Sequence, residues 1–179
     1  MMRRIAATAA SAACTLLGLG AGLGIGATPA QADSPWTPYH QEDAVVPAAR
    51  STCAFDVRET VVDDAERYRT TATYPDGSPK TQVFQGTLVM SFTNTTTGSS
   101  VIHDLSGEGV FEYNADGTPA SLTSTHGPFG ATLPAGSTPD TGIFVLSGHG
   151  TSVTFNPDGT RTYVVGPSGS VIDVCAELG

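Results

Sequence analysis

Two copies of one motif lie in the second half of the chain. Leu105-Ser106-Gly107-Glu108-Gly109 recurs as Leu146-Ser147-Gly148-His149-Gly150, and each copy is followed by an apolar stretch and then by an Asp-Gly pair. Each unit has the pattern of a strand, a glycine-rich bend, a second strand, a turn and a third strand. Two units are too few for a propeller, but they fit two equivalent corners of a barrel, where glycine lets a strand bend sharply.

The residues from Cys53 onward form short runs in which apolar and polar side chains alternate. After residue 32, Thr and Val far outnumber Leu and Ala, and β-branched residues favour strands over helices. The runs cover residues 53–62, 66–74, 81–93, 101–105, 110–113, 120–125, 143–149, 152–155, 161–165 and 171–175. We therefore predict a single all-β domain over 53–179, an antiparallel meander barrel or barrel-like sandwich of about ten short strands. A helical turn is expected only at 63–66.

Three connections between these runs share one turn chemistry. They are Pro75-Asp76-Gly77, Ala115-Asp116-Gly117 and Pro157-Asp158-Gly159. Proline fits the fixed negative φ of a type I turn, and glycine supplies the left-handed residue of the bulge that follows. We predict three hairpins of this kind, and no calcium site, because the ligand series of a calcium loop does not accompany any of these aspartates.

The first 32 residues have the pattern of an export signal. Arg3 and Arg4 precede an uncharged run rich in Ala, Gly and Leu, and Ala30-Gln31-Ala32 is a signal-peptidase site with cleavage between Ala32 and Asp33. A permanent membrane helix is the alternative, but the glycines of the run weaken it. We predict a secreted protein without an integral membrane span after processing. Residues 33–52, with scattered prolines and charges, are predicted to be a mobile lead-in.

Two cysteines remain after such processing, Cys53 and Cys175, and in an exported chain they most simply pair with each other. The bond closes a loop of roughly 120 residues, which the chain-entropy model values at about 4–5 kcal/mol. A thiol nucleophile or a metal-binding pair is disfavoured because neither cysteine has C-x-x-C spacing. The formal net charge of the whole chain is −9, which disfavours partners such as nucleic acids and anionic lipids.

Candidate chemistry is sparse. His103, His126 and His149 are evenly spaced, and a meander barrel that brings them to one rim would provide metal ligands; the alternative is that each is an ordinary strand-end histidine. A hydrolase would need Ser106 or Ser147 to meet a histidine and Asp104 in space. No cofactor is predicted from the sequence.

The sequence resembles a group of secreted actinobacterial proteins. The resemblance rests on the Ala/Gly-rich signal, the Cys53-x-Phe55-x-Val57 opening, the segment from Ser91 to Gly98, the Gly-x-Gly bends and the Asp173-Val174-Cys175 ending. It covers roughly residues 53–178, and its short motifs imply export and a β domain. The resemblance implies no activity and no catalytic residue.

The leading hypothesis is a secreted, non-catalytic protein that binds a small apolar ligand or a component of the cell envelope, because small barrels commonly enclose a ligand cavity. The alternatives are a secreted hydrolase or histidine-metal enzyme, and a surface interaction module. The leading hypothesis requires a hollow interior. It fails if a solid core is formed by residues 84, 88, 90, 92, 111, 144 and 155, which are Phe, Leu or Met.

Overall fold

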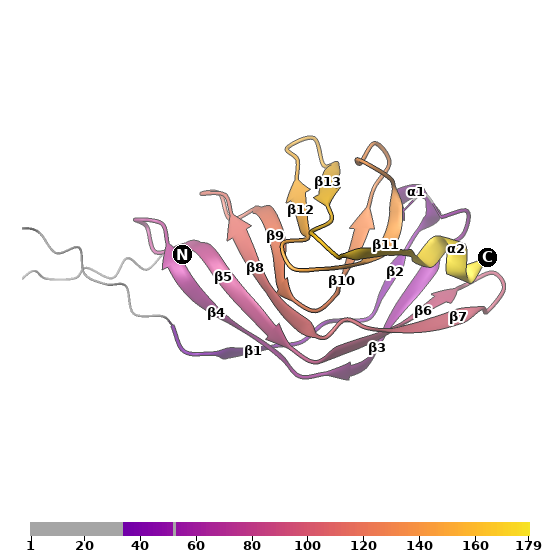
Figure 1. Ribbon diagram of the computed structural model, residues 1–179, viewed down its shortest axis with the longest axis horizontal. Coiled ribbons are helices and arrows are strands. Elements are labelled where there is room, and N and C mark those ends of the chain that lie inside the picture. The colour runs from indigo at the N-terminus through magenta and orange to yellow at the C-terminus, as the bar shows by residue number, and fades with distance from the viewer. Residues whose placement is uncertain (1–33, 52) are drawn as a thin grey trace, which may run out of the picture. The chain divides into compact units, whose positions relative to one another are not determined.

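The computed structural model describes residues 34–51 and 53–179, which form strands and two short helices (Figure 1). The strands are β1 (Thr37–Tyr39), β2 (Ala44–Val46), β3 (Val57–Asp64), β4 (Glu66–Thr73), β5 (Pro79–Gly86), β6 (Leu88–Asn94), β7 (Ser100–Asp104), β8 (Gly107–Tyr113), β9 (Pro119–His126), β10 (Phe129–Leu133), β11 (Gly142–Ser147), β12 (Ser152–Phe155), β13 (Arg161–Val164) and β14 (Ser170–Asp173). The helices are α1 (Ala48–Ser51) and α2 (Val174–Leu178). The prediction of an all-β fold is confirmed.

Long strands that bend near their middle explain the topology. The pairs β3–β4, β5–β6, β7–β8, β9–β10, β11–β12 and β13–β14 each run through a bend of a few residues, and hairpins connect one pair to the next. On one side of the bends, a seven-stranded antiparallel sheet has the order β1-β4-β5-β8-β9-β12-β13. On the other side the meander divides into a four-stranded sheet, β2-β3-β6-β7, and a three-stranded sheet, β10-β11-β14. In the described chain β7 and β10 are not paired, so the barrel is not closed and the architecture is a barrel-like sandwich.

The repeated motif lies at two of these bends, as the sequence predicts. Leu105 and Ser106 separate β7 from β8, and Gly148 lies between β11 and β12. A Cβ atom added at Gly107 would lie 2.4 Å from the carbonyl oxygen of His126, and one at Gly148 would lie 2.5 Å from the Cα atom of Gly169. Neighbouring strands therefore approach so closely at the bends that only glycine fits there.

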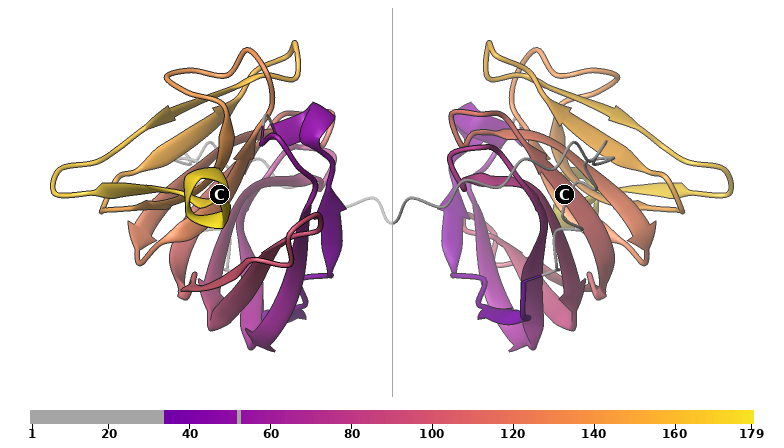
Figure 2. Two further views of the ribbon diagram at one scale, coloured as in Figure 1. Left: turned by 90° about the vertical axis from the view of Figure 1, so that its right-hand side faces the viewer. Right: turned by 90° about the vertical axis from the view of Figure 1, so that its left-hand side faces the viewer.

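The central strand of the three-stranded sheet, β11, is buried on both faces. Ile143 and Val145 of β11 pack against Val57, Met90 and Phe92 of the four-stranded sheet. On the opposite face of β11, a second core cluster joins it to the far end of the seven-stranded sheet and consists of Ala131, Leu133, Phe144, Leu146, Val153 and Tyr163. The unbroken apolar run of β11 is the pattern expected of a strand enclosed on both sides. Figure 2 shows the orange and yellow strands of this region facing the indigo and magenta strands of the four-stranded sheet.

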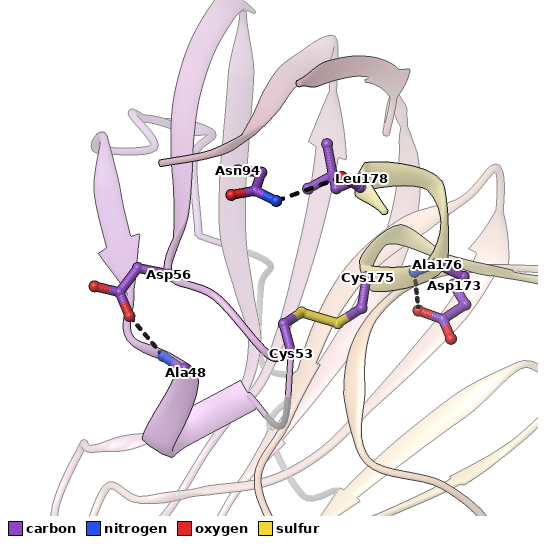
Figure 3. The surroundings of a disulfide bond; sticks show 8 residues. All are labelled: Ala48, Cys53, Asp56, Asn94, Asp173, Cys175, Ala176 and Leu178. Atoms are coloured by element: carbon purple, nitrogen blue, oxygen red, sulfur yellow. Dashed lines mark hydrogen bonds between the residues drawn. A yellow bond between two sulfur atoms is a disulfide. The ribbon is translucent and has the colours of Figure 1, made fainter. Parts of the chain in front are cut away.

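The predicted disulfide is present. Cys53 and Cys175 are bonded across a sequence separation of 122 residues, with their Cα atoms 5.4 Å apart (Figure 3). Cys175 belongs to helix α2, so the prediction of a strand over residues 171–175 is wrong at its last two residues. The side chain of Asp173 caps this helix by accepting from the Ala176 backbone N–H, and the Asn94 side chain donates to the carbonyl of Leu178. The helical turn expected at 63–66 is instead the bend between β3 and β4.

The segment expected to be a mobile lead-in contains two paired strands. Strand β1 pairs with β4, so that Tyr39 lies opposite Glu66, and β2 pairs with β3. Trp36 lies beneath the guanidinium groups of Arg67 and Arg69, at 4.8 and 4.9 Å from its ring centroid. The hydrogen bonds of these strand pairs and the two cation–π contacts attach the segment to both parts of the bent meander.

The Asp-Gly turns have the predicted geometry. Gly77, Gly117 and Gly159 have φ values of +87°, +82° and +85°, which are left-handed conformations. The Gly77 N–H donates to the carbonyl of Tyr74, and Asp76 accepts from the backbone N–H of Ser78. The carboxylates thus bond within their own turns, which is a structural role.

Candidate functional site

A cavity of about 310 Å³ lies on the inner face of the meander, where the strands bend. Its size is at the lower end of the range for small-molecule sites. Its apolar lining comes from β1, β5, β6, β8, β9 and β10 and from the bends between them, and consists of Tyr39, Phe84, Leu88, Leu105, Phe111, Tyr113, Leu122, Pro128 and Phe129. Three glycines, Gly107, Gly109 and Gly130, complete the lining.

Aromatic rings form one continuous side of the cavity. Phe84 contacts the rings of Tyr39 and Phe111 edge-on, with centroid separations of 5.4 and 5.1 Å. Phe111 in turn stacks near Tyr113 at 6.0 Å. Gly109 stands opposite Phe84 on β8, whereas Tyr68 stands opposite it on β4 and stacks on its ring at 5.3 Å. These rings line the cavity, and none of them is fully buried.

The ligand-binding hypothesis requires that seven large apolar side chains do not fill the interior completely. Phe84, Leu88 and Phe111 line the cavity, while Met90 and Phe92 line a second cavity of about 130 Å³ beside it. The two cavities share Gln41, Leu88, Leu105 and Gly130 as lining residues. Phe144 and Phe155 belong to the packed cluster around β11. The interior is thus packed at one end and hollow at the bend.

Glu66 is the most perturbed ionisable group of the site. It begins β4 at the bend, lines the larger cavity, and has one carboxyl oxygen, Oε2, buried without a hydrogen-bond partner in the described chain. Burial raises the pKa of Glu66 to about 7, and the nearby charge of Asp64 adds to the rise. At neutral pH this carboxyl group is therefore divided between its protonated and ionised forms.

Asp64, two residues earlier, has the opposite environment. Its carboxylate accepts from the backbone N–H groups of Glu66 and Gln41, at 3.0 and 2.8 Å, and lies 3.5 Å from Nδ1 of His40. Burial alone would raise the pKa of Asp64, but these donors and His40 hold it below its usual value. Asp64 thus fixes the bend and the lead-in segment, whereas the hydrogen-bonding capacity of Glu66 remains available.

The polar groups near the cavities are acidic or neutral. Burial raises the pKa of Tyr39, with further contributions from Glu66 and Asp64, and burial also raises the pKa of Glu59 in the smaller cavity. Glu108 contributes to the lining of the larger cavity. None of the described lining residues of either cavity is Lys, Arg or His. The described lining of the site therefore contains acidic side chains and no basic side chain that would neutralise them.

The three predicted histidines lie in different surroundings. His103 on β7 bonds through Nε2 to a carboxyl oxygen of Glu177 at 2.7 Å and packs near the ring of Phe92. His126 ends β9 and is exposed, and the Nδ1 atom of exposed His149 bonds to the carbonyl oxygen of Thr125. Within residues 34–51 and 53–179, no three His, Cys, Asp or Glu side chains form a group that could hold a metal ion. The structure does not bring His103, His126 and His149 together.

The serines considered for hydrolysis also have structural partners. The Ser106 hydroxyl accepts from the backbone N–H of Leu88, and its own backbone N–H donates to Asp104. The hydroxyl of Ser147 bonds with that of Ser170. These contacts fix the two bends, and neither serine has a hydrogen bond to a histidine among the described residues.

The remaining predictions concern export and relatives. Ala32 and Asp33, the predicted cleavage site, lie outside the described residues. Over the described ranges, neither helix has the length and apolarity needed to cross a bilayer. Comparisons with protein-family models, with curated proteins and with solved structures found no significant match to this chain.

The sequence pattern did not identify Glu66 or Tyr39 as site residues. Glu66 is one of several acidic residues in a polar stretch, and Tyr39 lies in a segment without apolar periodicity. The two become neighbours only because β1 pairs with the start of β4. A usable signal was the excess of glycine at positions 107 and 109 in a run otherwise typical of a strand, since glycine in a strand often marks close approach or space for a ligand.

Proposed function

We propose that this protein is a secreted, non-catalytic β protein that binds a small apolar ligand in the cavity at the bend. One observation carries the proposal: a cavity of about 310 Å³ is walled mainly by aromatic and aliphatic side chains, with Gly107, Gly109 and Gly130 in its lining. Burial of an apolar ligand there is favoured by about 25 cal/mol for each Å² removed from water. The disulfide and the absence of a membrane-crossing helix among the described residues are compatible with an extracellular site of action.

The packing around the cavity supports a preformed site. Strand β11 and the disulfide hold the sheets on both sides of the bend, so the cavity does not depend on a ligand to keep its walls apart. A preformed site loses less conformational entropy on binding than one that must be ordered first. An apolar component of the cell envelope has the same chemistry. Such a component is a ligand of this site when its apolar part is small enough for the cavity.

The test is titration with a neutral apolar fluorophore, N-phenyl-1-naphthylamine, whose emission rises in apolar surroundings. We expect saturable binding at one site per chain. Leu88→Trp places a large ring at the junction of the two cavities and should abolish binding. Val89→Trp places the same ring on the opposite face of β6 and should preserve it, because side chains alternate along a strand.

The result is decisive in both directions. Saturable binding that Leu88→Trp removes and Val89→Trp retains supports the proposal. The absence of saturable binding, or equal binding by both tryptophan variants, excludes the cavity as the binding site. Circular dichroism and urea unfolding of each variant establish that both are folded before the titrations are compared.

A further inference from the structure

The cavity has an electrostatic preference as well as an apolar one. Glu66 lines its wall with an unpartnered carboxyl oxygen, Glu59 lines the adjoining cavity, and both are partly buried. No basic side chain stands among the described residues that line either space. Isolated charge in a partly apolar site is costly, and a ligand with the opposite charge is the simplest group that relieves the cost.

We propose that the ligand is a lipophilic amine, with its ammonium group against Glu66 and its apolar part over the rings of Phe84 and Phe111. This inference rests on the proposed function and names the ligand class for the same cavity. An ammonium group donates charge-assisted hydrogen bonds to a carboxylate, which are about twice as strong as bonds between neutral groups.

The aromatic wall reinforces the same preference. Tyr39 lies opposite Glu66 across the β1–β4 pair, and its ring contacts Phe84 edge-on. The faces of such rings attract cations, so a charged nitrogen at Glu66 has favourable neighbours on the β1 side as well. The negative net charge of the chain adds a longer-range attraction for cations and repels anions.

The ionisable surroundings of Glu66 are acidic. Asp64 precedes it at the bend, Tyr39 faces it from β1, Glu108 lines the cavity from β8, and Glu59 lies in the adjoining cavity. His40 is paired with Asp64, and Arg67 follows Glu66 on the opposite face of β4, over Trp36. Because none of the described lining residues is basic, ionised Glu66 is available to an ammonium group. Protonated Glu66 would instead donate a hydrogen bond to a neutral acceptor.

The experiment compares three ligands with one chain and three head groups: octylamine, octan-1-ol and octanoate. Calorimetric titration is performed on the wild-type protein, on Glu66→Gln, and on Glu42→Gln as a control with the same change of charge. Glu42 is exposed and lies outside the lining of both cavities. Aliphatic amines remain protonated at about pH 8.5, where Glu66 is mainly ionised.

We expect wild-type protein to bind octylamine about tenfold more tightly than octan-1-ol, as a hydrogen bond between charged groups predicts, and to bind octanoate most weakly. Glu66→Gln should remove the preference for the amine over octan-1-ol. Glu42→Gln should keep the preference. The preference should also decrease at about pH 5, where Glu66 is protonated.

The possible failures are distinguishable. Equal affinity of wild-type protein for octylamine and octan-1-ol overturns the amine assignment and leaves the apolar-ligand proposal standing. A preference for octan-1-ol that grows toward acidic pH also overturns it, in favour of a neutral acceptor held by protonated Glu66. If none of the three ligands binds and the neutral fluorophore also fails to bind, the proposed function itself is wrong.

Discussion

Replacement of Glu66 by Gln should stabilise the protein at neutral and alkaline pH, where the wild-type side chain must ionise. Gln has the shape of a protonated Glu and carries no charge, so the variant avoids the cost of ionising a buried carboxyl group. The pKa of Glu66 rises from an ordinary value of 4.5 to about 7 in the folded protein. The folded state therefore keeps this proton longer than the unfolded chain, and stability is lost as pH rises through the folded pKa.

The magnitude follows from the size of the rise. One pKa unit corresponds to about 1.4 kcal/mol, so the full rise sets an upper limit of about 3.5 kcal/mol. Glu66 is only half-buried, and solvent screening reduces the expected effect to about 1–2 kcal/mol. Glu66→Gln should therefore be about 1–2 kcal/mol more stable than wild type at about pH 8.5, and nearly equal to it at about pH 5.

Urea unfolding of wild type, Glu66→Gln and Glu42→Gln at the two pH values measures this difference directly. Other groups that titrate in this range cancel when each variant is compared with wild type at one pH. Glu42→Gln should show no comparable gain, because the exposed carboxylate of Glu42 remains in water. The argument is refuted if Glu66→Gln is less stable than wild type at about pH 8.5 and nearly equal to it at about pH 5, since Glu66 would then be making a favourable contact as an anion.

Two other substitutions test the fold. Joint replacement of Cys53 and Cys175 by Ser should lower the free energy of unfolding by about 3–5 kcal/mol, measured in urea, because it frees a loop of 122 residues; an unchanged midpoint would contradict this role. Gly86→Ala should cost more than Gly77→Ala, which should cost about 1–2 kcal/mol for its left-handed backbone alone. A Cβ at Gly86 would lie 2.4 Å from the carbonyl oxygen of Ala65, whereas a Cβ at Gly77 meets nothing within 4 Å. Equal thermal shifts for the two alanine variants would refute the close approach at the bend.

Local chemistry made much of the fold predictable. The Asp-Gly turns, the alternating strands and the glycine bends depend on residues close in sequence, so their patterns are visible without a structure. The Cys53–Cys175 bond was predictable for a different reason, since these are the cysteines that remain after the predicted signal cleavage. Helix α2 was missed because alternation from Val171 to Cys175 resembles a strand, whereas Asp173 caps a helix there.

The division of the sheet and the cavity were not predictable in this way. Nothing local to β7 or β10 shows that these strands separate while β8 and β9 remain paired. The continuous apolar run of β11 indicates burial on both faces, but the sheets that cover it are distant in sequence. The environment of Glu66 similarly depends on pairing with β1 and on rings from β5 and β8. Only the assembled strands create that half-buried, unpartnered carboxyl group.

Leucine methyl groups provide the most direct test of where a ligand binds. Of the leucines that follow residue 32, Leu88, Leu105 and Leu122 line the larger cavity, and the other three, Leu133, Leu146 and Leu178, are buried in the core clusters. Methyl-labelled protein titrated with octylamine should show saturable NMR shifts concentrated on the three cavity leucines, with much smaller changes at the core leucines. Shifts that are largest at the core leucines would contradict a ligand site in this cavity, and absent shifts would contradict the binding of octylamine there.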